Sequence, residues 1–475
     1  MPHLDPRAFK ANAHQALADR ELASALRRMS AGLVPKRAEA VAALPEFEAL
    51  SERAREIKDH TLLHLDHYLE VFERNCVAAG GQVHWCATAE EARARILEIC
   101  RARGARVVTK AKSMVAEELH LNAFLERHAI EPVETDLGEY IVQLADEVPS
   151  HIIAPAIHKT KEQISELFER HHASARRSEP EALIAEAREV LRQRFLDADV
   201  GITGANFLVA ETGSSVIVTN EGNGDLTQIL PRTHVVVASI EKVVPTLEDA
   251  TTLLRLLARS ATGQAFSAYT TFSTGPRRPD DADGPEEYHV ILLDNGRSAM
   301  LGTEFQDMLR CIRCGACLNH CPIYRSIGGH AYGTVYVGPM GAVLSPALVG
   351  LETTQDLPYA STFCGRCESV CPMQIPLPRM RRAWRERAPE SGRTSLVERR
   401  GLALWAWFAT RPGLYGLGAR AAVRLLAWLG RKNGRIERLP FAAGWTGGRD
   451  LPAPEGKTFQ ELWRADAGGI RSGEG

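Results

Sequence analysis

At 475 residues, the chain is too long for one ordinary hydrophobic core, and we expect two or three domains. Its apolar content of 45% and charged content of 24% are those of a globular protein, and its formal net charge of −2 gives no electrostatic case for binding nucleic acid. The start, MPHLDPRAFKANAHQALADREL, has no apolar core and is unlike a secretory signal. We therefore expect a cytoplasmic protein whose clustered thiols bind metal and do not form disulfides.

Residues 1–75 are predicted to be an N-terminal helical segment, because apolar residues recur there at helical spacing. Residues 76–300 alternate short apolar runs with amphipathic segments, which predicts an α/β domain with a largely parallel sheet. Strands are expected in ARVVTKAKS, HIIAPAI, FLVAETGSSVIVTN, HVVVASI and HVILLDN, and helices in EEARARILEICRAR and PEALIAEAREVLRQRFL. GSSVIVTN followed by HVVVAS also predicts some antiparallel pairing. The scattered Cys76, Cys86 and Cys100 are expected to be buried structural thiols.

Several loops of residues 76–300 place Gly, Ser, Thr and Asn at strand ends, where backbone N–H groups can bind a carboxylate or phosphate. These loops are GANFLVAETGS and TNEGNGD, and Lys110, Lys112, His158 and Lys159 lie near other predicted strand ends. The catalytic residues are unknown from sequence, with Glu211 as a candidate nucleophile. For each residue taken singly, turn chemistry or a solvated charge is the favoured explanation. Neither G-x-G-x-x-G after a strand nor G-x4-G-K-[ST] occurs, so nothing indicates NAD, FAD or ATP.

Seven of the ten cysteines form two groups within residues 301–385. The first, CIRCGACLNHCP, is a complete C-x2-C-x2-C-x3-C-P run, and the second, STFCGRCESVCP, has the same ending. Iron–sulfur clusters need soft thiolate ligands, and the fourth cysteine of such a run ligates the other cluster in two-cluster ferredoxins. Zinc is the rival, but its sites usually combine two separated C-x2-C pairs. We therefore predict a small α-helical, ferredoxin-like module with two 4Fe-4S clusters, which indicates electron transfer.

The crossed arrangement assigns each of these cysteines to one cluster. The first cluster is predicted to be bound by Cys311, Cys314, Cys317 and Cys371. The second is predicted to be bound by Cys321, Cys364 and Cys367. Ser361 stands where the second group lacks a cysteine, and three possibilities stay open: an oxygen ligand, a bystander beside an open iron, or a sign of a 3Fe-4S cluster. A four-iron cluster with a non-cysteine or exchangeable fourth ligand is favoured, and His320 is expected to face solvent.

Residues 386–475 are predicted to be a Trp-rich, helical C-terminal segment. The stretch GLALWAWFATRPGLYGLGARAAVRLLAWLG is interrupted by Arg411 and Pro412, so it lacks the roughly 18 uninterrupted apolar residues of a membrane-spanning helix. Six of the seven tryptophans lie from Trp384 onward. Packing against a partner protein or within the chain is favoured, and peripheral contact with the inner face of the membrane is the alternative.

On these residues the chain resembles a known family. CIRCGACLNHCPIYRSIGGHAYGTVYVGPMGAVLSP, GITGANFLVAETGSSVIVTNEGNG, VETDLGEYIVQLADEVPSHIIAPAIHKT and GKTFQELWRA resemble the iron–sulfur protein B family of the bacterial lactate-utilization operon. The resemblance covers nearly the whole chain. It implies an α/β domain of the LUD type, similar to the sugar-phosphate isomerase and CoA-transferase fold group. Three cysteines in the second group are typical of that family, so Ser361 is no departure.

The resemblance also implies a function. The chain would be the electron-transfer subunit of a complex that oxidises L-lactate to pyruvate without NAD. Its partners would be a cysteine-rich redox protein and a small LUD-domain protein. Two alternatives stay open from the residues alone: an independent acyl-transfer or isomerase-type enzyme with accessory clusters, and a redox sensor.

Overall fold

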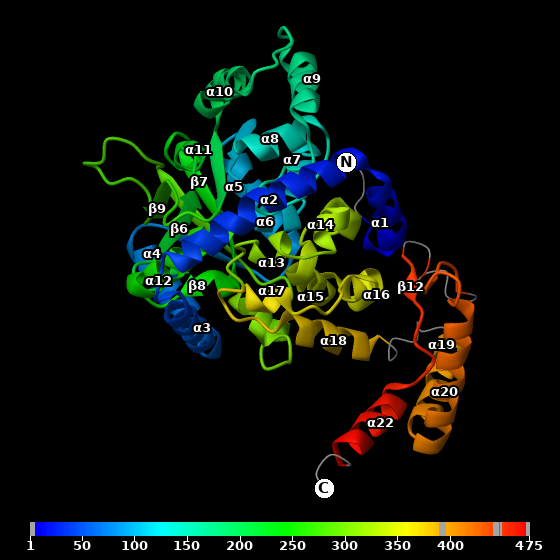
Figure 1. The fold of residues 1–475 in the computed structure, drawn as a ribbon. Coiled ribbons are helices and arrows are strands. Elements are labelled where there is room, and N and C mark those ends of the chain that lie inside the picture. Colours follow the sequence, from blue (N-terminus) through cyan, green and yellow to red (C-terminus); the bar gives the residue numbers. More distant parts are fainter. Residues whose placement is uncertain (1–4, 389–395, 440–445, 447–448, 472–475) are drawn as a thin grey trace. The chain divides into compact units, whose positions relative to one another are not determined.

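The computed structural model describes residues 5–388, 396–439, 446 and 449–471. The chain divides into two compact units, Met1–Ser391 and Gly392–Gly475. Figure 1 shows the first unit built around a sheet in which strands from distant parts of the chain lie side by side. The α/β domain and the cysteine module therefore belong to one unit.

A parallel sheet forms the centre of the first unit. Its strand order is β1-β10-β7-β4-β2-β3, and all of its strand pairs are parallel. Successive residues of β7 pack on opposite faces, Val235 and Val237 on one and Val236 and Ala238 on the other, as in a parallel sheet covered on both sides. The strands are β1 (Gln82–Cys86), β2 (Val107–Lys110), β3 (Glu131–Glu134), β4 (Val200–Gly204), β7 (Thr233–Ser239) and β10 (Glu287–Leu293).

Helices cover both faces of this sheet, so the predicted α/β domain with a parallel sheet is confirmed. Side-chain caps begin several of these helices, and Thr160 and Gln163 form a reciprocal capping box at one of them. One face is covered by α5 (Ala89–Ala102), α6 (Met114–Glu118) and α7 (Leu121–Glu126), and the other by α4 (Leu65–Ala78). A further core lies among α8 (Leu137–Leu144), α9 (Lys161–His172) and α10 (Pro180–Asp197), while α11 (Asn223–Ile229) contacts β4 and β7.

A second, smaller sheet differs from the expected pairing. Its order is β8-β5-β6-β9, and β6 pairs antiparallel with β5 and β9. The expectation that GSSVIVTN pairs with HVVVAS is wrong, because β6 and β7 lie in different sheets. The strands are β5 (Phe207–Val209), β6 (Ser214–Thr219), β8 (Val243–Val244) and β9 (Tyr269–Ser273).

The predicted strand HIIAPAI is also wrong, since residues 151–157 form turns and bends. Nδ1 of His151 accepts hydrogen bonds from the backbone N–H groups of Ile153 and Ala154, each at 3.1 Å. These bonds offer the backbone an alternative to a strand ladder, and Pro155 has no N–H to donate to one. The apolar residues of this loop face the site described below.

The N-terminal helices pack against the cysteine module, about 250 or more residues further along the chain. Leu26 and Met29 share a core with Tyr324 and Met340. The N-terminal helices are α1 (Phe9–Ala18), α2 (Arg20–Ala42) and α3 (Phe47–Leu63), and α12 (Leu247–Ala261) packs with them. The module contains α13 (Ala316–Asn319), α14 (Tyr324–Ile327), α15 (Gly338–Val349), α16 (Leu351–Thr354), α17 (Arg366–Ser369) and α18 (Leu377–Arg387).

The second unit is largely helical. Its elements are α19 (Leu396–Ala409), α20 (Pro412–Leu429), β11 (Arg435–Ile436), β12 (Leu451–Pro452) and α22 (Phe459–Arg471). Pro412 occupies the first turn of α20, as expected for a residue without an N–H, and separates it from α19. In the described part of the chain, no helix is both long and apolar enough to cross a membrane. Trp445, one of the tryptophans of the predicted tail, lies outside the described residues.

Candidate iron–sulfur site and adjoining cavity

Four cysteines surround a small cavity in the core of the module. They are Cys311, Cys314, Cys317 and Cys371. The connecting loop turns sharply because Arg313 and Gly315 have φ of 59° and 73°. A Cβ on Gly315 would lie 2.9 Å from Cδ1 of Ile153, so this loop packs closely against the loop of residues 151–157. The first cysteine set is therefore enclosed from the side of the α/β domain.

Three cysteines line a second small cavity. They are Cys321, Cys364 and Cys367. Ser361 lines it too, and its hydroxyl accepts a hydrogen bond of 3.1 Å from the N–H of Phe363. Cys364 is exposed, so this set is open to solvent where the first is enclosed. The structure brings together the two sets that the spacing predicted, and their roles as ligands stay a prediction.

The grouping of the thiols bears on which metal the sites suit. Among the described residues, no group of three cysteine sulfurs lies within 4.8 Å of one another. Seven soft thiol ligands around two cavities therefore suit iron–sulfur clusters.

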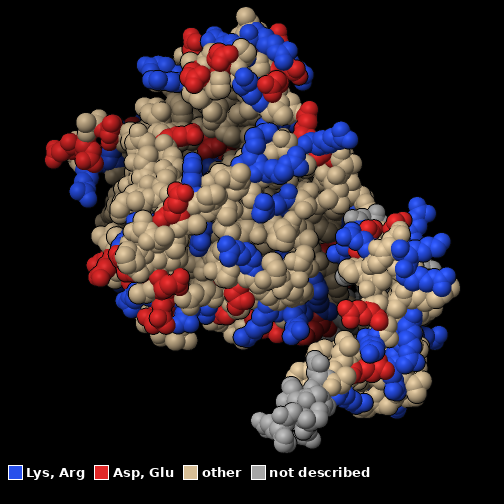
Figure 2. Space-filling model, viewed as in Figure 1, with Lys and Arg blue, Asp and Glu red and all other residues tan. Residues whose placement is uncertain are grey.

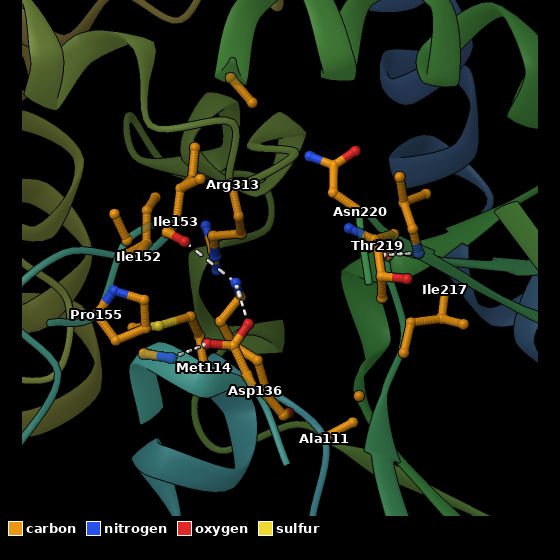
Figure 3. A pocket seen from close by; sticks show the side chains of 18 of the residues that line it. Ala111, Met114, Asp136, Ile152, Ile153, Pro155, Ile217, Thr219, Asn220 and Arg313 are labelled. Carbon is orange, nitrogen blue, oxygen red and sulfur yellow. Dashed lines mark hydrogen bonds and ion pairs between the residues drawn. The ribbon is translucent and has the colours of Figure 1, made fainter. Parts of the chain in front are cut away.

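A larger cavity of about 600 Å³ lies within the α/β domain, and Arg313 of the cysteine module also lines it. Figure 3 shows Ile152, Ile153 and Pro155 on one side of it and Thr219 and Asn220 on the other. Ile152 and Arg313 line both this cavity and the cavity of the first cysteine set. The two cavities thus share these two residues in their walls.

Three cationic side chains line the large cavity, and they differ in their partners. Nζ of Lys112 lies 3.0 Å from Oδ2 of Asp136 and donates to the carbonyl of Ile153 at 3.1 Å, as the dashed lines in Figure 3 show. Nη2 of Arg313 donates to Glu241 at 3.1 Å, while its Nη1 meets no acceptor within the described residues. Lys242 is buried, and the described part of the chain provides no hydrogen bond or ion pair for its ammonium group.

A buried chain of ion pairs fixes Arg313. Arg297, fully buried, lies 2.6 Å from Glu118 and 3.0 Å from Glu241, and Arg313 lies on the other oxygen of Glu241. The guanidinium group of Arg313 also stacks 4.9 Å from the ring of Tyr336. Although burial raises the pKa of Glu241, Arg297 and Arg313 together lower it to about 2. The chain thus joins the α/β domain to the cluster loop.

Three family models match the chain: LUD domain at residues 69–293, 4Fe-4S dicluster domain at 307–375, and Lactate utilisation protein B, C-terminal, at 366–467. Lactate utilization protein B of Bacillus licheniformis is 43% identical over 461 residues, 96% of each chain. That of Bacillus subtilis (strain 168) is 42% identical over 462 residues, 97% of this chain and 96% of its own. The chain belongs to the lactate utilization protein B family.

Another relative carries a redox name: the Escherichia coli (strain K12) "uncharacterized electron transport protein YkgF" is 42% identical over 458 residues, 96% of each chain. As a member of the lactate utilization protein B family, the chain is an iron–sulfur protein in which a LUD-type α/β domain precedes a 4Fe-4S dicluster domain. The resemblance stated from the sequence is thereby confirmed.

Burial raises the pKa of several thiols in the two sets. Burial raises the pKa of Cys314 and of Cys371 to about 12 and that of Cys367 to about 11. The pKa of the exposed Cys364 is instead lowered, because the backbone N–H of Arg366 and the hydroxyl of Thr362 stabilise its thiolate. Without metal, the thiols of Cys314, Cys367 and Cys371 stay protonated at neutral pH, so metal binding by them displaces protons.

The residues that the sequence suggested for an anion site lie in different parts of the structure. Among the candidates for an anion site, Lys112 lines the large cavity, whereas Lys110 is buried against Glu117 and Glu134, at 2.7 Å from each. His158 and Lys159 both pair with Glu147. Neither lines the large cavity.

Glu211 does not line the large cavity either. It is exposed, and its carboxylate accepts a hydrogen bond of 3.0 Å from the N–H of Leu247 at the start of α12. A carboxylate at a helix N-terminus is an ordinary stabilising contact. The structure thus gives Glu211 a structural contact at this helix end.

His320 corrects another expectation. It is only 9% exposed, and its Nδ1 donates to the carbonyl of Ala316 at 2.8 Å, so the expectation that it faces solvent is wrong. Cys76, Cys86 and Cys100 are buried, as expected. Sequence reasoning missed Arg313 and Lys242. A basic residue inside the first C-x2-C pair was the available signal for Arg313, and nothing in the local sequence marks Lys242.

Proposed function

We propose that the chain is the electron-transfer subunit of a complex that oxidises L-lactate to pyruvate. The observation that carries this proposal is the pair of cysteine sets, one enclosed beside a cavity and the other open to solvent. The family name supplies the substrate. The clusters would supply one-electron transfer, and the chain's own residues enclose one site and expose the other.

Two helices interlock the sets, which supports transfer between them. α13 carries Cys317 of the first set and leads to Cys321 of the second, and α17 carries Cys367 of the second and leads to Cys371 of the first. Each short helix therefore joins a cysteine of one set to a cysteine of the other along the chain. We propose two 4Fe-4S clusters, the first bound by four cysteines and the second by three, with Ser361 beside its free corner.

We propose that the open set is where electrons leave toward a partner. Exposed Arg366, Arg379 and Arg382 lie on α17 and α18 around it, and Figure 2 shows blue side chains gathered over these helices. Such a rim would steer an acidic protein surface toward the cluster. The proposed partners are a cysteine-rich redox protein and a small LUD-domain protein. Peripheral membrane contact by α19 and α20 and a likeness of the α/β domain to the isomerase and CoA-transferase fold group remain proposals.

The test is anaerobic purification of the chain alone and with tagged partners, followed by iron and sulfide counts and EPR in both redox states. We expect about eight irons per chain if both clusters contain four. L-lactate should reduce the clusters when the partners are present. Absence of reduction by L-lactate with every partner loaded would overturn the proposed substrate, and full-rate dye reduction by the isolated chain would overturn the need for partners.

A further inference from the structure

We infer that the cavity of about 600 Å³ is a binding site for a small carboxylate, held by Arg313 and Lys242 directly beside the first cysteine set. The anion site follows from the geometry of the cavity. Its assignment to 2-hydroxy and 2-oxo acids rests on the proposed function. The chain would therefore carry the acid next to its own cluster.

Arg313 offers a buried N–H donor at the cavity. Its side chain is 10% exposed, and two of its faces are occupied, one by Glu241 and one by the ring of Tyr336. Nη1 meets no acceptor among the described residues, although Arg313 lines the cavity. Figure 3 shows Arg313 at the cavity between the wall of Ile153 and the wall of Asn220. A buried guanidinium N–H without an acceptor is unfavourable, and a carboxylate oxygen would satisfy it.

Lys242 is the second buried cation that lines the cavity. It is 6% exposed, and burying an ammonium group without an anion beside it costs free energy. The adjacent Glu241 is already shared by Arg297 and Arg313, so its charge is divided among several cations. Lys242 lines the cavity with no ion partner of its own within the described residues. A ligand carboxylate would supply one.

The acidic groups of the cavity do not fill that role. Asp136 is paired with Lys112 and caps α8, accepting from the N–H groups of Gly138 and Glu139 at 3.0 and 3.2 Å. Glu221 lies by the backbone of Leu137, at the same helix end. The lining therefore contains three cations, Lys112, Lys242 and Arg313, and two carboxylates, Asp136 and Glu221, and Glu241, the partner of Arg313, is not among the lining residues.

The rest of the lining suits an organic acid. Apolar side chains form much of the wall, and cavities of a few hundred Å³ with apolar walls and a few polar groups are the usual form of small-molecule sites. The isoleucines and leucines among them are Leu137, Ile141, Ile152, Ile153, Ile157, Ile217 and Leu257. Because Arg313 lies inside the cluster loop, an anion bound to it would change the electrostatic field at the first cluster.

The experiment measures pyruvate binding to the anaerobic, cluster-loaded protein by calorimetry and by the EPR-monitored midpoint potential of each cluster. Pyruvate is expected to bind and to lower the potential of one cluster, while the neutral analogue pyruvamide does neither. Lys242→Met should weaken pyruvate binding by about tenfold or more, and Lys242→Arg should restore most of it. Lys112→Gln is the matched control, because that lysine already has Asp136, and we expect a smaller loss.

Arg313→Lys is a second variant, with iron and sulfide counts to check cluster loading. The competing explanation is that Lys242 only balances the charge of the cluster. In that case Lys242→Met shifts the midpoint potential while pyruvate binds as tightly as in the unmodified protein, and this result overturns the site. Failure of pyruvate to bind the unmodified protein at all also overturns it. If pyruvate binds but L-lactate never reduces the loaded complex, the anion site stands and the proposed substrate fails. If L-lactate reduces the complex while the chain binds no carboxylate, the proposed substrate stands and the anion site fails.

Discussion

The two cysteine sets of the module share a motif and differ in their surroundings. The first lies in the core, against the loop of Ile153 and beside the large cavity, and Cys314 is 8% exposed. The second has Cys364 exposed and is closed on one side by Ser361 in place of a cysteine. Similar local sequences thus produce an enclosed site and an open one, and the loop of Ile153 in the α/β domain packs against Gly315 of the first.

The largest expected effect comes from removing cysteines of the second motif one at a time. Cys371→Ser should destroy the first cluster and Cys364→Ser only the second, because Cys371 lines the cavity of the first set. Each variant should lose roughly half of the iron, with different EPR signals missing. Loss of the same signal in both variants would contradict the crossed arrangement.

A smaller effect is expected at the ion-pair chain that supports the enclosed set. Glu241→Gln leaves Arg297 and Arg313 buried without their shared anion, and we expect a loss of about 3–5 kcal/mol in the free energy of unfolding, measured by urea denaturation under anaerobic conditions. The matched control is Glu166→Gln, whose partner Arg176 is 51% exposed, and a much smaller change is expected there. Equal losses in the two variants would show that the buried ion pairs of Glu241 contribute no more to the free energy of unfolding than the exposed pair of Glu166.

The lowered pKa of the Glu241 carboxylate predicts that the stability of the folded protein depends on pH. Because the pKa of Glu241 is lowered from 4.5 to about 2 in the folded protein, the stability it contributes is present above pH 4.5 and lost as the pH falls toward 2. Unfolding measured between pH 6 and pH 3 should show a shallower loss of stability in Glu241→Gln than in the unmodified protein. Parallel curves would indicate that Glu241 does not contribute to this acid sensitivity.

The smallest effect compares the corresponding glycines of the two loops. Gly315 and Gly365 have φ of 73° and 75°, so alanine at either position costs about 1–2 kcal/mol from backbone strain alone. Only Gly315→Ala also meets Ile153, whereas the Cβ of Gly365→Ala would have nothing within 4 Å. We expect Gly315→Ala to be the more destabilising in thermal unfolding. Adding Ile153→Val, which removes Cδ1, should bring the thermal stability of Gly315→Ala closer to that of Gly365→Ala. If the added substitution restores no stability, the close packing of Gly315 against Ile153 is contradicted.

What the sequence could predict depends on how local the signal is. Alternating helices and strands located the parallel sheet, and cysteine spacing grouped the seven ligand candidates into the sets that the structure brings together. The loop at residues 151–157 was missed because its apolar residues resemble a strand, while side-chain hydrogen bonds from its backbone to His151 and the contact with Gly315 decide its shape. Lys242 gave no local sign, since its position beside the cluster loop depends on contacts between distant parts of the chain.

The packing of the N-terminal helices against the module has a consequence for synthesis. Arg37 donates to the carbonyl of Val370 at 2.8 Å, across 333 residues of sequence. At about 5–20 residues per second, the helix that carries Arg37 emerges from the ribosome on the order of tens of seconds before its partner exists. Its apolar face must stay shielded through that interval, so this unit closes only when its last segment, the one that carries the cysteines, has been made. The burial of the chain's first helices is thus a late event in its biogenesis, set by the segment that also carries the cysteines.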